Sequence, residues 1–294
     1  MSVFVQQQGT SCDFSGGDSW VILSPIEQSI KRKIEAVGTP LKDWDIQINY
    51  GIKTGFNDAF IIDTAKRDEI LNNCSDEDER KRTEELIRPI LRGRDIRRYG
   101  YEWANLWLIN THNGVKGRIP RIDIKDYPAV KQHLDCYWDK IKDRADQGDT
   151  PYNLRNCAYL EEFSRPKIIY PNMTKYMPFV YDTNGYYTNQ KCFIITGSYT
   201  AFLTAFFNSS LFKFCFRDSF PELQGGTREL SKIFFDRIPV LMVSETINNK
   251  FADMLSKQDV NKFEEWAIRI DDAIFDIYNL SIQERYQIGH IKIQ

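Results

Sequence analysis

The 294-residue sequence lacks the features by which several classes of protein are recognised. No apolar run reaches the roughly 20 residues that span a bilayer. Residues 1–6 have neither the basic region nor the long apolar region of a secretion signal. The six cysteines are spread singly, without a C-x-x-C pair or a Cys/His cluster of zinc spacing. We therefore expect a cytoplasmic protein with reduced thiols, no membrane contact and no metal site.

Motifs for self-contained catalysis are missing as well. There is no G-x-x-x-x-G-K-[ST] phosphate loop, and the three histidines lie far apart without ligand spacing. Residues 123–125 are only a fragment of the carboxylate and lysine pattern of a metal-dependent nuclease. Residues 14–18 and 170–173 only faintly resemble the two loops of a methyltransferase. We expect no catalytic residue and no cofactor in this chain; the alternative is an enzyme with an unrecognised site.

The composition is that of an ordinary globular protein, with 42% hydrophobic and 27% charged residues. The formal net charge is −2, whereas a chain that coats nucleic acid non-specifically is usually basic overall. Any binding of nucleic acid must therefore come from a local basic patch.

The apolar periodicity predicts short strands and several helices. Ser24–Glu27 is a capping box with proline at the first helical position, and it should begin a helix that runs to Val37. Strands are predicted at residues 46–50, 59–62, 106–109, 167–170, 179–181 and 193–195, and helices at 63–71, 128–144, 198–216, 244–257 and 259–279. Because strands and helices do not alternate regularly, we predict a mixed α/β (α+β) fold. It should have a largely antiparallel or mixed sheet, flanking helices and a C-terminal helical pair.

The most informative segment is Arg88–Arg98, which holds five arginines and one acid. The planar fork of arginine suits both phosphate and the guanine edge. Crowding in one segment favours phosphate contacts, since base-reading residues are usually scattered, and Asp95 should pair with one of the arginines. The alternative is a solvated basic loop, or one that pairs with the nearby acidic run. We expect the phosphate contacts from Arg92, Arg94, Arg97 and Arg98.

A second basic stretch lies at residues 114–125, where glycines are interleaved with basic residues. A glycine-rich basic loop suits a phosphate backbone, so Lys116, Arg118 and Arg121 are further candidates for DNA-backbone contacts.

Two segments of the sequence, Gly51–Ile62 followed by Leu91–Tyr99, resemble a known family in their order and spacing. They are similar to the TaqI-like C-terminal specificity domain, the target recognition domain of type IIG and related adenine-specific DNA methyltransferases. Supporting similarities lie at Phe163–Tyr170, Ala201–Leu211, Ile238–Val240 and Ile270–Leu280. The resemblance covers about residues 20–285.

The resemblance implies sequence-specific recognition of double-stranded DNA, with base edges read in the major groove. A separate methyltransferase or nuclease domain, in cis or in trans, would bind S-adenosylmethionine or Mg²⁺ and perform the chemistry. Because the methyltransferase domain that precedes this one in the family is not found in the sequence, we expect the chain to be either an expressed fragment or a separately encoded specificity subunit. A non-DNA interaction module is the remaining alternative. We expect a lead-in at 1–19, a recognition domain at 20–240 and a C-terminal helical spacer or docking segment at 241–294.

Three polar loops are candidates for reading bases or facing the catalytic domain. Asn and Gln can pair with adenine, and Lys and Arg with guanine. An ordinary surface turn, or a structural hairpin in the first loop, is the alternative for each. The candidates are Thr54, Gly55 and Asn57 in the first loop, Asn189, Gln190 and Lys191 in the second, and Gln224, Thr227 and Arg228 in the third.

Overall fold

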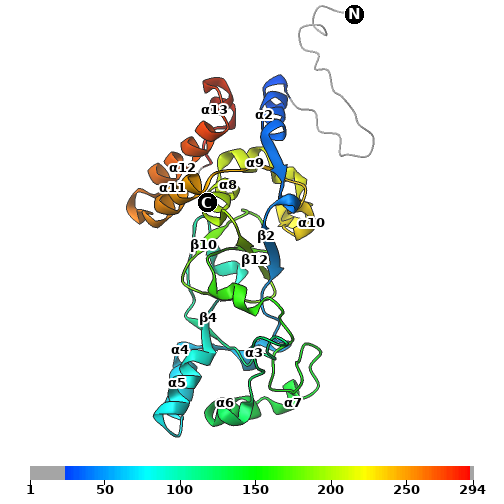
Figure 1. Cartoon of the computed structure of the whole chain (residues 1–294), viewed down its shortest axis with the longest axis vertical. Helices are drawn as coiled ribbons and strands as arrows, with labels where there is room; N and C mark the ends of the chain where they lie inside the picture. The colour runs from blue at the N-terminus through cyan, green and yellow to red at the C-terminus, as the bar shows by residue number, and fades with distance from the viewer. Residues whose placement is uncertain (1–23, 292–294) are drawn as a thin grey trace, which may run out of the picture.

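Two four-stranded sheets form the middle of the computed structural model, which describes residues 24–291 (Figure 1). The predicted lead-in at 1–19 lies outside the described residues. The first sheet has the order β10 (Val180–Asp182), β8 (Lys167–Pro171), β12 (Cys192–Gly197) and β2 (Ile46–Tyr50), all antiparallel. The second has the order β11 (Tyr187–Thr188), β4 (Ile87–Leu91), β7 (Leu106–Ile109) and β3 (Ile61–Asp63). In the second sheet only the β11–β4 pair is parallel.

There are also three short two-stranded ribbons, of which the first two join segments that are distant in the sequence and the third is a local hairpin. They pair β1 (Gly38–Pro40) with β14 (Pro239–Leu241), β13 (Arg228–Glu229) with β9 (Met173–Thr174), and β5 (Ile96–Arg97) with β6 (Gly100–Tyr101).

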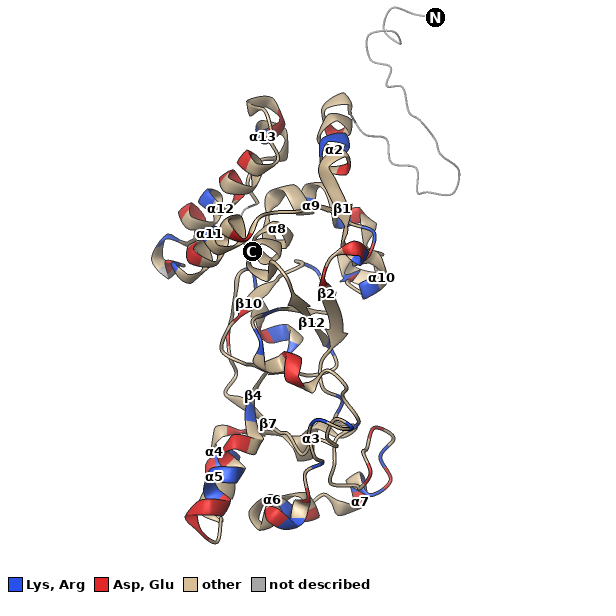
Figure 2. Cartoon of the chain, in the orientation of Figure 1, with Lys and Arg blue, Asp and Glu red and all other residues tan. Residues whose placement is uncertain are grey.

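The helices gather at the two ends of the elongated molecule (Figure 1). At one end lie α3 (Asn57–Phe60), α4 (Thr64–Asn72), α5 (Glu77–Leu86), α6 (Pro128–Asp135) and α7 (Trp138–Ile141). Toward the other lie α2 (Pro25–Val37), α8 (Thr200–Asn208), α9 (Ser210–Phe216), α10 (Lys232–Phe235), α11 (Glu245–Ser256), α12 (Phe263–Ile277) and α13 (Ile282–Ile288). The predicted mixed α/β fold, with its largely antiparallel sheets and flanking helices, is confirmed. On the outer helix α5, runs of acidic and basic residues follow one another, whereas the charged residues of α12 are mostly acidic (Figure 2).

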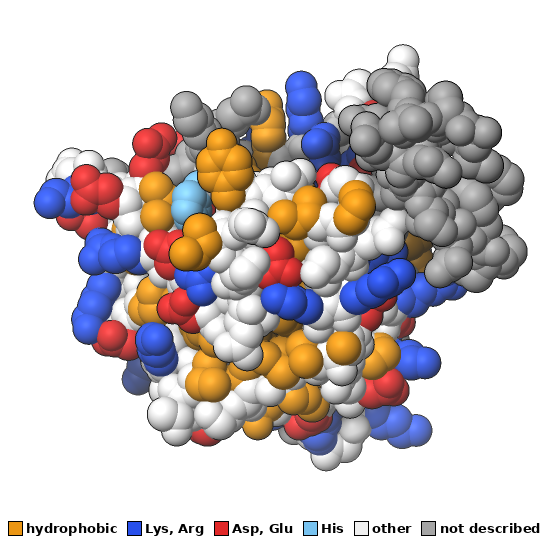
Figure 3. Space-filling model, turned by 90° about the horizontal axis from the view of Figure 1, so that it is seen from above, with side chains coloured by type: hydrophobic (Ala, Val, Ile, Leu, Met, Phe, Trp, Pro, Cys, Tyr) orange, Lys and Arg blue, Asp and Glu red, His pale blue; other side chains and the backbone are white. Residues whose placement is uncertain are grey.

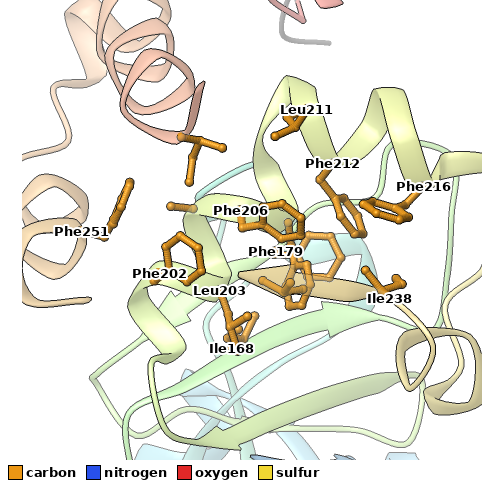
Figure 4. Packing of buried hydrophobic residues seen from close by; sticks show 14 of the residues in the cluster. Ile168, Phe179, Phe202, Leu203, Phe206, Leu211, Phe212, Phe216, Ile238 and Phe251 are labelled. Carbon is orange, nitrogen blue, oxygen red and sulfur yellow. The ribbon is translucent and has the colours of Figure 1, made fainter. Parts of the chain in front are cut away.

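The first sheet is buried on both faces because its side chains alternate between two hydrophobic cores. On β8, Ile168 and Tyr170 belong to the core under α8 and α9, whereas Ile169 belongs to the core of the second sheet. Phe202 and Leu203 of α8 lie over Ile168 in the first of these cores (Figure 4). One sheet therefore connects the two halves of the molecule.

The C-terminal helices share this first core. Phe251 of α11 and Trp266, Ile270 and Ile274 of α12 are buried in it, and α11 packs against α8. The helical pair is thus as predicted, and it is integrated with the sheet, while the division at residue 240 stays a prediction.

Three predicted elements differ from the structure. The helix predicted over 128–144 is divided into α6, which ends at Asp135, and α7, which ends at Ile141. The helix predicted over 198–216 is two helices, α8 and α9, because Ser209 leaves helical geometry and its Oγ accepts a hydrogen bond from the Phe212 N–H at 3.1 Å. Serine favours this capping position. The strand predicted at 59–62 begins as the helical turn α3 and becomes extended only at Ile61. The capping box at Ser24 and the helix that follows it are confirmed.

Candidate nucleic-acid interface

A surface groove of about 890 Å³ lies where the arginine-rich segment meets α9 and the chain that follows α13. Its lining includes six basic side chains and neither Asp nor Glu: Arg94, Arg97, Arg98, Lys175, Lys213 and Arg217. We call this feature the basic groove. Met173 and Tyr176 also line it, and about half of each side chain is exposed. A groove with this charge and these aromatic and apolar side chains suits a polyanion that carries bases.

One arginine at its edge is occupied by an internal carboxylate. The buried Asp95 accepts hydrogen bonds from Arg92 at the backbone N (2.8 Å), Nε (3.0 Å) and a terminal nitrogen (2.8 Å). The expected pairing of Asp95 with an arginine is thereby confirmed. Gly93 makes this turn close against β8, since a Cβ at Gly93 would lie 3.2 Å from the Cβ of Pro171.

The other three arginines of this segment line the basic groove, and they differ in exposure and in their partners within the chain. Arg94 is exposed, and its side chain makes no hydrogen bond or ion pair within residues 24–291. Arg97 is exposed and pairs with Glu102 at 2.7 Å. Arg98 has only 8% of its side chain exposed. Its Nε donates to the Asn208 carbonyl at 3.0 Å and one terminal nitrogen to the Ile291 carbonyl at 3.2 Å.

Three cations of the groove were missed by the sequence analysis. Lys175 follows β9, and Lys213 and Arg217 lie four residues apart at the end of α9, so that they share one side of it. Burial, with help from the positive charge of Arg98, lowers the pKa of Lys213 to about 7. The sequence signal that could have indicated this part of the groove is the four-residue spacing of Lys213 and Arg217 at the end of an otherwise apolar helix.

Two of the predicted base-reading loops flank the wall of the groove formed by residues 171–178. The backbone N–H of Asn172 donates to the Lys191 carbonyl at 2.9 Å, which places the loop at 189–191 beside it. Strand β13 pairs Arg228 with Thr174, which places the loop at 224–228 beside the same wall.

Within these loops the side chains differ in accessibility. Gln190, Lys191 and Gln224 are exposed, and the Thr227 hydroxyl donates to the Gln224 carbonyl at 3.0 Å. Asn189 is buried, and its side-chain oxygen accepts from the Lys191 N–H at 3.2 Å.

Arg228 is buried and held by internal partners. It donates to the Phe220 carbonyl at 2.8 Å and forms ion pairs with Asp218 (2.9 Å) and Glu222 (2.8 Å). Both terminal nitrogens are therefore engaged within the chain, while Nε is buried and makes no hydrogen bond among the described residues.

The loop with Thr54, Gly55 and Asn57 lies in the other half of the molecule, beside α3. Thr54 is buried and its hydroxyl donates to the Asn57 side-chain oxygen at 2.6 Å. Gly55 has a φ of +69°, which favours glycine. Arg144, which the sequence analysis did not single out, donates from Nε to the Thr54 carbonyl at 2.9 Å and also to the carbonyls of Pro151 and Asn153. Arg144 therefore holds the backbone of this loop in place through the Thr54 carbonyl.

The second basic stretch lies in the same half and not at the basic groove. Lys116 is exposed. Arg118 pairs with Glu161 at 2.6 Å and Arg121 with Asp149 at 3.5 Å. The predicted contacts thus form a set around the basic groove and a set around the Thr54 loop. The loop at 189–191 adjoins both, since Asn189 forms a β-bridge with Ile52. None of the assigned contact roles is tested by these positions.

Among residues 24–291, no cluster of three or more His, Cys, Asp or Glu side chains could hold a metal ion. The cysteines of this range are free thiols. No helix of the described part is long and apolar enough to cross a membrane.

Comparison with known proteins identifies the family. The model of the TaqI-like C-terminal specificity domain matches residues 88–240, just over half of the sequence. The chain therefore belongs to this family, and the resemblance found in its motifs is confirmed.

Individual proteins are also similar to the chain. The chain is 22% identical over 283 residues to the type II methyltransferase M.PaeR7I of Pseudomonas aeruginosa, covering 94% of this chain and 45% of that protein. Its fold is similar to the type IIL restriction-modification enzyme MmeI, solved in complex with DNA (TM-score 0.52, 12% identity, 85% of this chain and 35% of that one). The type IIG restriction endonuclease BpuSI also matches (TM-score 0.49, 12% identity, 87% and 34%). The chain spans less than half the length of each.

Proposed function

We propose that this chain recognises double-stranded DNA and positions a separate catalytic domain of a type II restriction-modification enzyme or adenine-specific DNA methyltransferase. The observation that carries the proposal is the basic groove, because its lining is free of acids although the chain as a whole has a net charge of −2. Membership of the specificity-domain family and similarity to a type II methyltransferase support it.

Within this proposal, the exposed cations of the basic groove contact phosphates and fix the register of the duplex. The exposed Gln190, Lys191 and Gln224, on loops beside the groove, are the stronger candidates for reading base edges. The Thr54 loop and the Lys116 loop would meet DNA or the catalytic domain with the other half of the molecule. Methyl transfer with S-adenosylmethionine, and any Mg²⁺-dependent cleavage, would belong to domains beyond this chain.

The test is a salt titration of binding to a pool of random-sequence duplexes, followed by fluorescence anisotropy. If the basic groove holds the backbone, Arg94→Ala and Lys175→Ala each reduce the slope of log K against log salt by about one. Lys250→Ala is the control, since Lys250 is exposed on α11, has no ion pair among the described residues and does not line the groove. Duplex binding that is absent or independent of salt would refute the proposal.

A further inference from the structure

The inner part of the basic groove brings together three cations from distant segments. Arg98 comes from the turn between β5 and β6, and Lys213 and Arg217 from the end of α9. The charges of Arg98 and Arg217 both act on Lys213. Because like charges repel, the group is more favourable when a negative charge compensates it.

Only one described carboxylate faces this group, and its hydrogen-bonding capacity is largely used. The buried Asp271 of α12 accepts from the Ser210 backbone N–H at 2.9 Å and from the Ser210 hydroxyl at 2.5 Å. It lies 3.7 Å from a terminal nitrogen of Arg98 and 3.4 Å from Nδ1 of His290. Arg98 and Lys213 therefore share a single anion, Asp271, and Arg217 has no ion pair among the described residues.

Two further observations show unused capacity for an anion. The terminal nitrogen of Arg98 nearest to Asp271 is buried and makes no hydrogen bond. Neither Lys213 nor Arg217 has a side-chain hydrogen bond or an ion pair within residues 24–291. Arg217 is exposed, whereas the unpaired nitrogen of Arg98 is buried, and burying a positive charge without a partner is costly.

We infer that Arg98, Lys213 and Arg217 form a seat for one phosphate of the DNA backbone, and that Lys213 takes up a proton when this phosphate binds. The inference rests on the proposed function of the basic groove. Lys213 and Arg217 would supply direct contacts, and Arg98 would hold the phosphate from the buried side.

The protonation step follows from the surroundings of Lys213. Burial and the positive charges of Arg98 and Arg217 lower its pKa to about 7, while Asp271 opposes them. A phosphate at the seat adds a negative charge, which raises the pKa of the ammonium group. At a pH above 7 the free protein must therefore gain a proton on binding, and its affinity falls as the pH rises.

The experiment measures duplex binding at constant ionic strength from about pH 6 to about pH 9, with wild type, Lys213→Met, Lys213→Arg and Lys175→Met. Wild type should lose up to about tenfold in affinity per pH unit above pH 7.5, the limit for one linked proton. Lys213→Met, which keeps the apolar stem, should bind more weakly at pH 6.5 and show a flat profile above pH 7.5. Lys213→Arg should bind more tightly than wild type at about pH 8.5.

Lys175→Met is the matched control, because Lys175 is an exposed lysine of the same groove. It should weaken binding while keeping the pH profile of the wild type. His290 is present in all four proteins, so a difference between their profiles isolates Lys213. Identical profiles and salt slopes for wild type and Lys213→Met overturn the inference alone. A wild-type protein that binds no duplex at any pH overturns the proposed function and this inference together.

Discussion

Replacement by alanine should affect stability at Arg92 and DNA binding at Arg94, although the two residues are only two positions apart. Arg92→Ala removes two charge-assisted hydrogen bonds to the buried Asp95, at 3.0 and 2.8 Å. Hydrogen bonds to charged groups contribute about 1.5–3 kcal/mol each, and the side chain of Arg92 is 21% exposed, so part of this is recovered from water. We expect the free energy of unfolding to fall by about 3 kcal/mol.

Arg94→Ala should leave stability unchanged, since its exposed side chain has no partner among the described residues. Substitutions at such surface positions usually stay within about 0.5 kcal/mol. The salt slope of duplex binding should instead fall by about one, because one fewer counterion is released. Arg92→Ala should keep the wild-type slope in the protein that remains folded.

Urea denaturation and salt titration of both variants measure the two effects independently. The double mutant Arg92→Ala/Asp95→Ala adds a check, because the two residues should show a coupling energy of about 2 kcal/mol. A stable Arg92→Ala variant with a reduced salt slope would contradict the reasoning. It would mean that Arg92 is released from Asp95 to bind phosphate.

Three further predictions concern residues whose partners lie within the chain. Arg228→Ala should lower the melting temperature and leave the recognised sequence unchanged; a relaxed base preference in a recognition-profile assay would show that Arg228 reads a base. Arg144→Met should cost about 3 kcal/mol, because several backbone carbonyls lose their donor, and should speed hydrogen exchange at residues 53–57; unchanged exchange there would show that this loop is fixed without it. For Glu284, burial is outweighed by hydrogen bonds from Lys33 and the chain around it, which lower its pKa to about 2. The ionised Glu284 therefore stabilises the folded state above the unfolded pKa of glutamate, and this stabilisation is lost as the pH falls toward 2. Between about pH 5 and pH 2, the free energy of unfolding of wild type should fall by on the order of 1 kcal/mol more than that of Glu284→Gln. Equal acid sensitivity in urea denaturation would count against it.

Local sequence patterns were sufficient to predict those structural features that depend on neighbouring residues. The capping box at Ser24 forms as predicted, because both of its hydrogen bonds lie within one turn. The C-terminal helices were predictable from their apolar spacing. The pairing of Asp95 with Arg92 spans only three residues.

Features that depend on distant segments were not predictable in the same way. The helix over 198–216 was interpreted as uniformly buried, so Lys213 and Arg217 were passed over. Their position in the groove depends on the break at Ser209 and on the packing of α9 beside the arginine-rich segment. Arg144 was missed because all of its acceptors are backbone carbonyls, which have no residue signature.

The contrast among the arginines indicates which property separates structural cations from those available to a ligand. Arg92, Arg118, Arg121 and Arg228 each have a carboxylate partner in the chain, whereas Arg94 has none among the described residues. Basic composition is therefore a weak guide to the interface, since an arginine already paired must give up that partner before it gains a phosphate. In the basic groove, Arg97 and Arg98 have carboxylate partners, whereas the other cations of its lining have no ion pair among the described residues: Arg94, Lys175, Lys213 and Arg217. A protein with a net negative charge can in this way present a local surface for DNA.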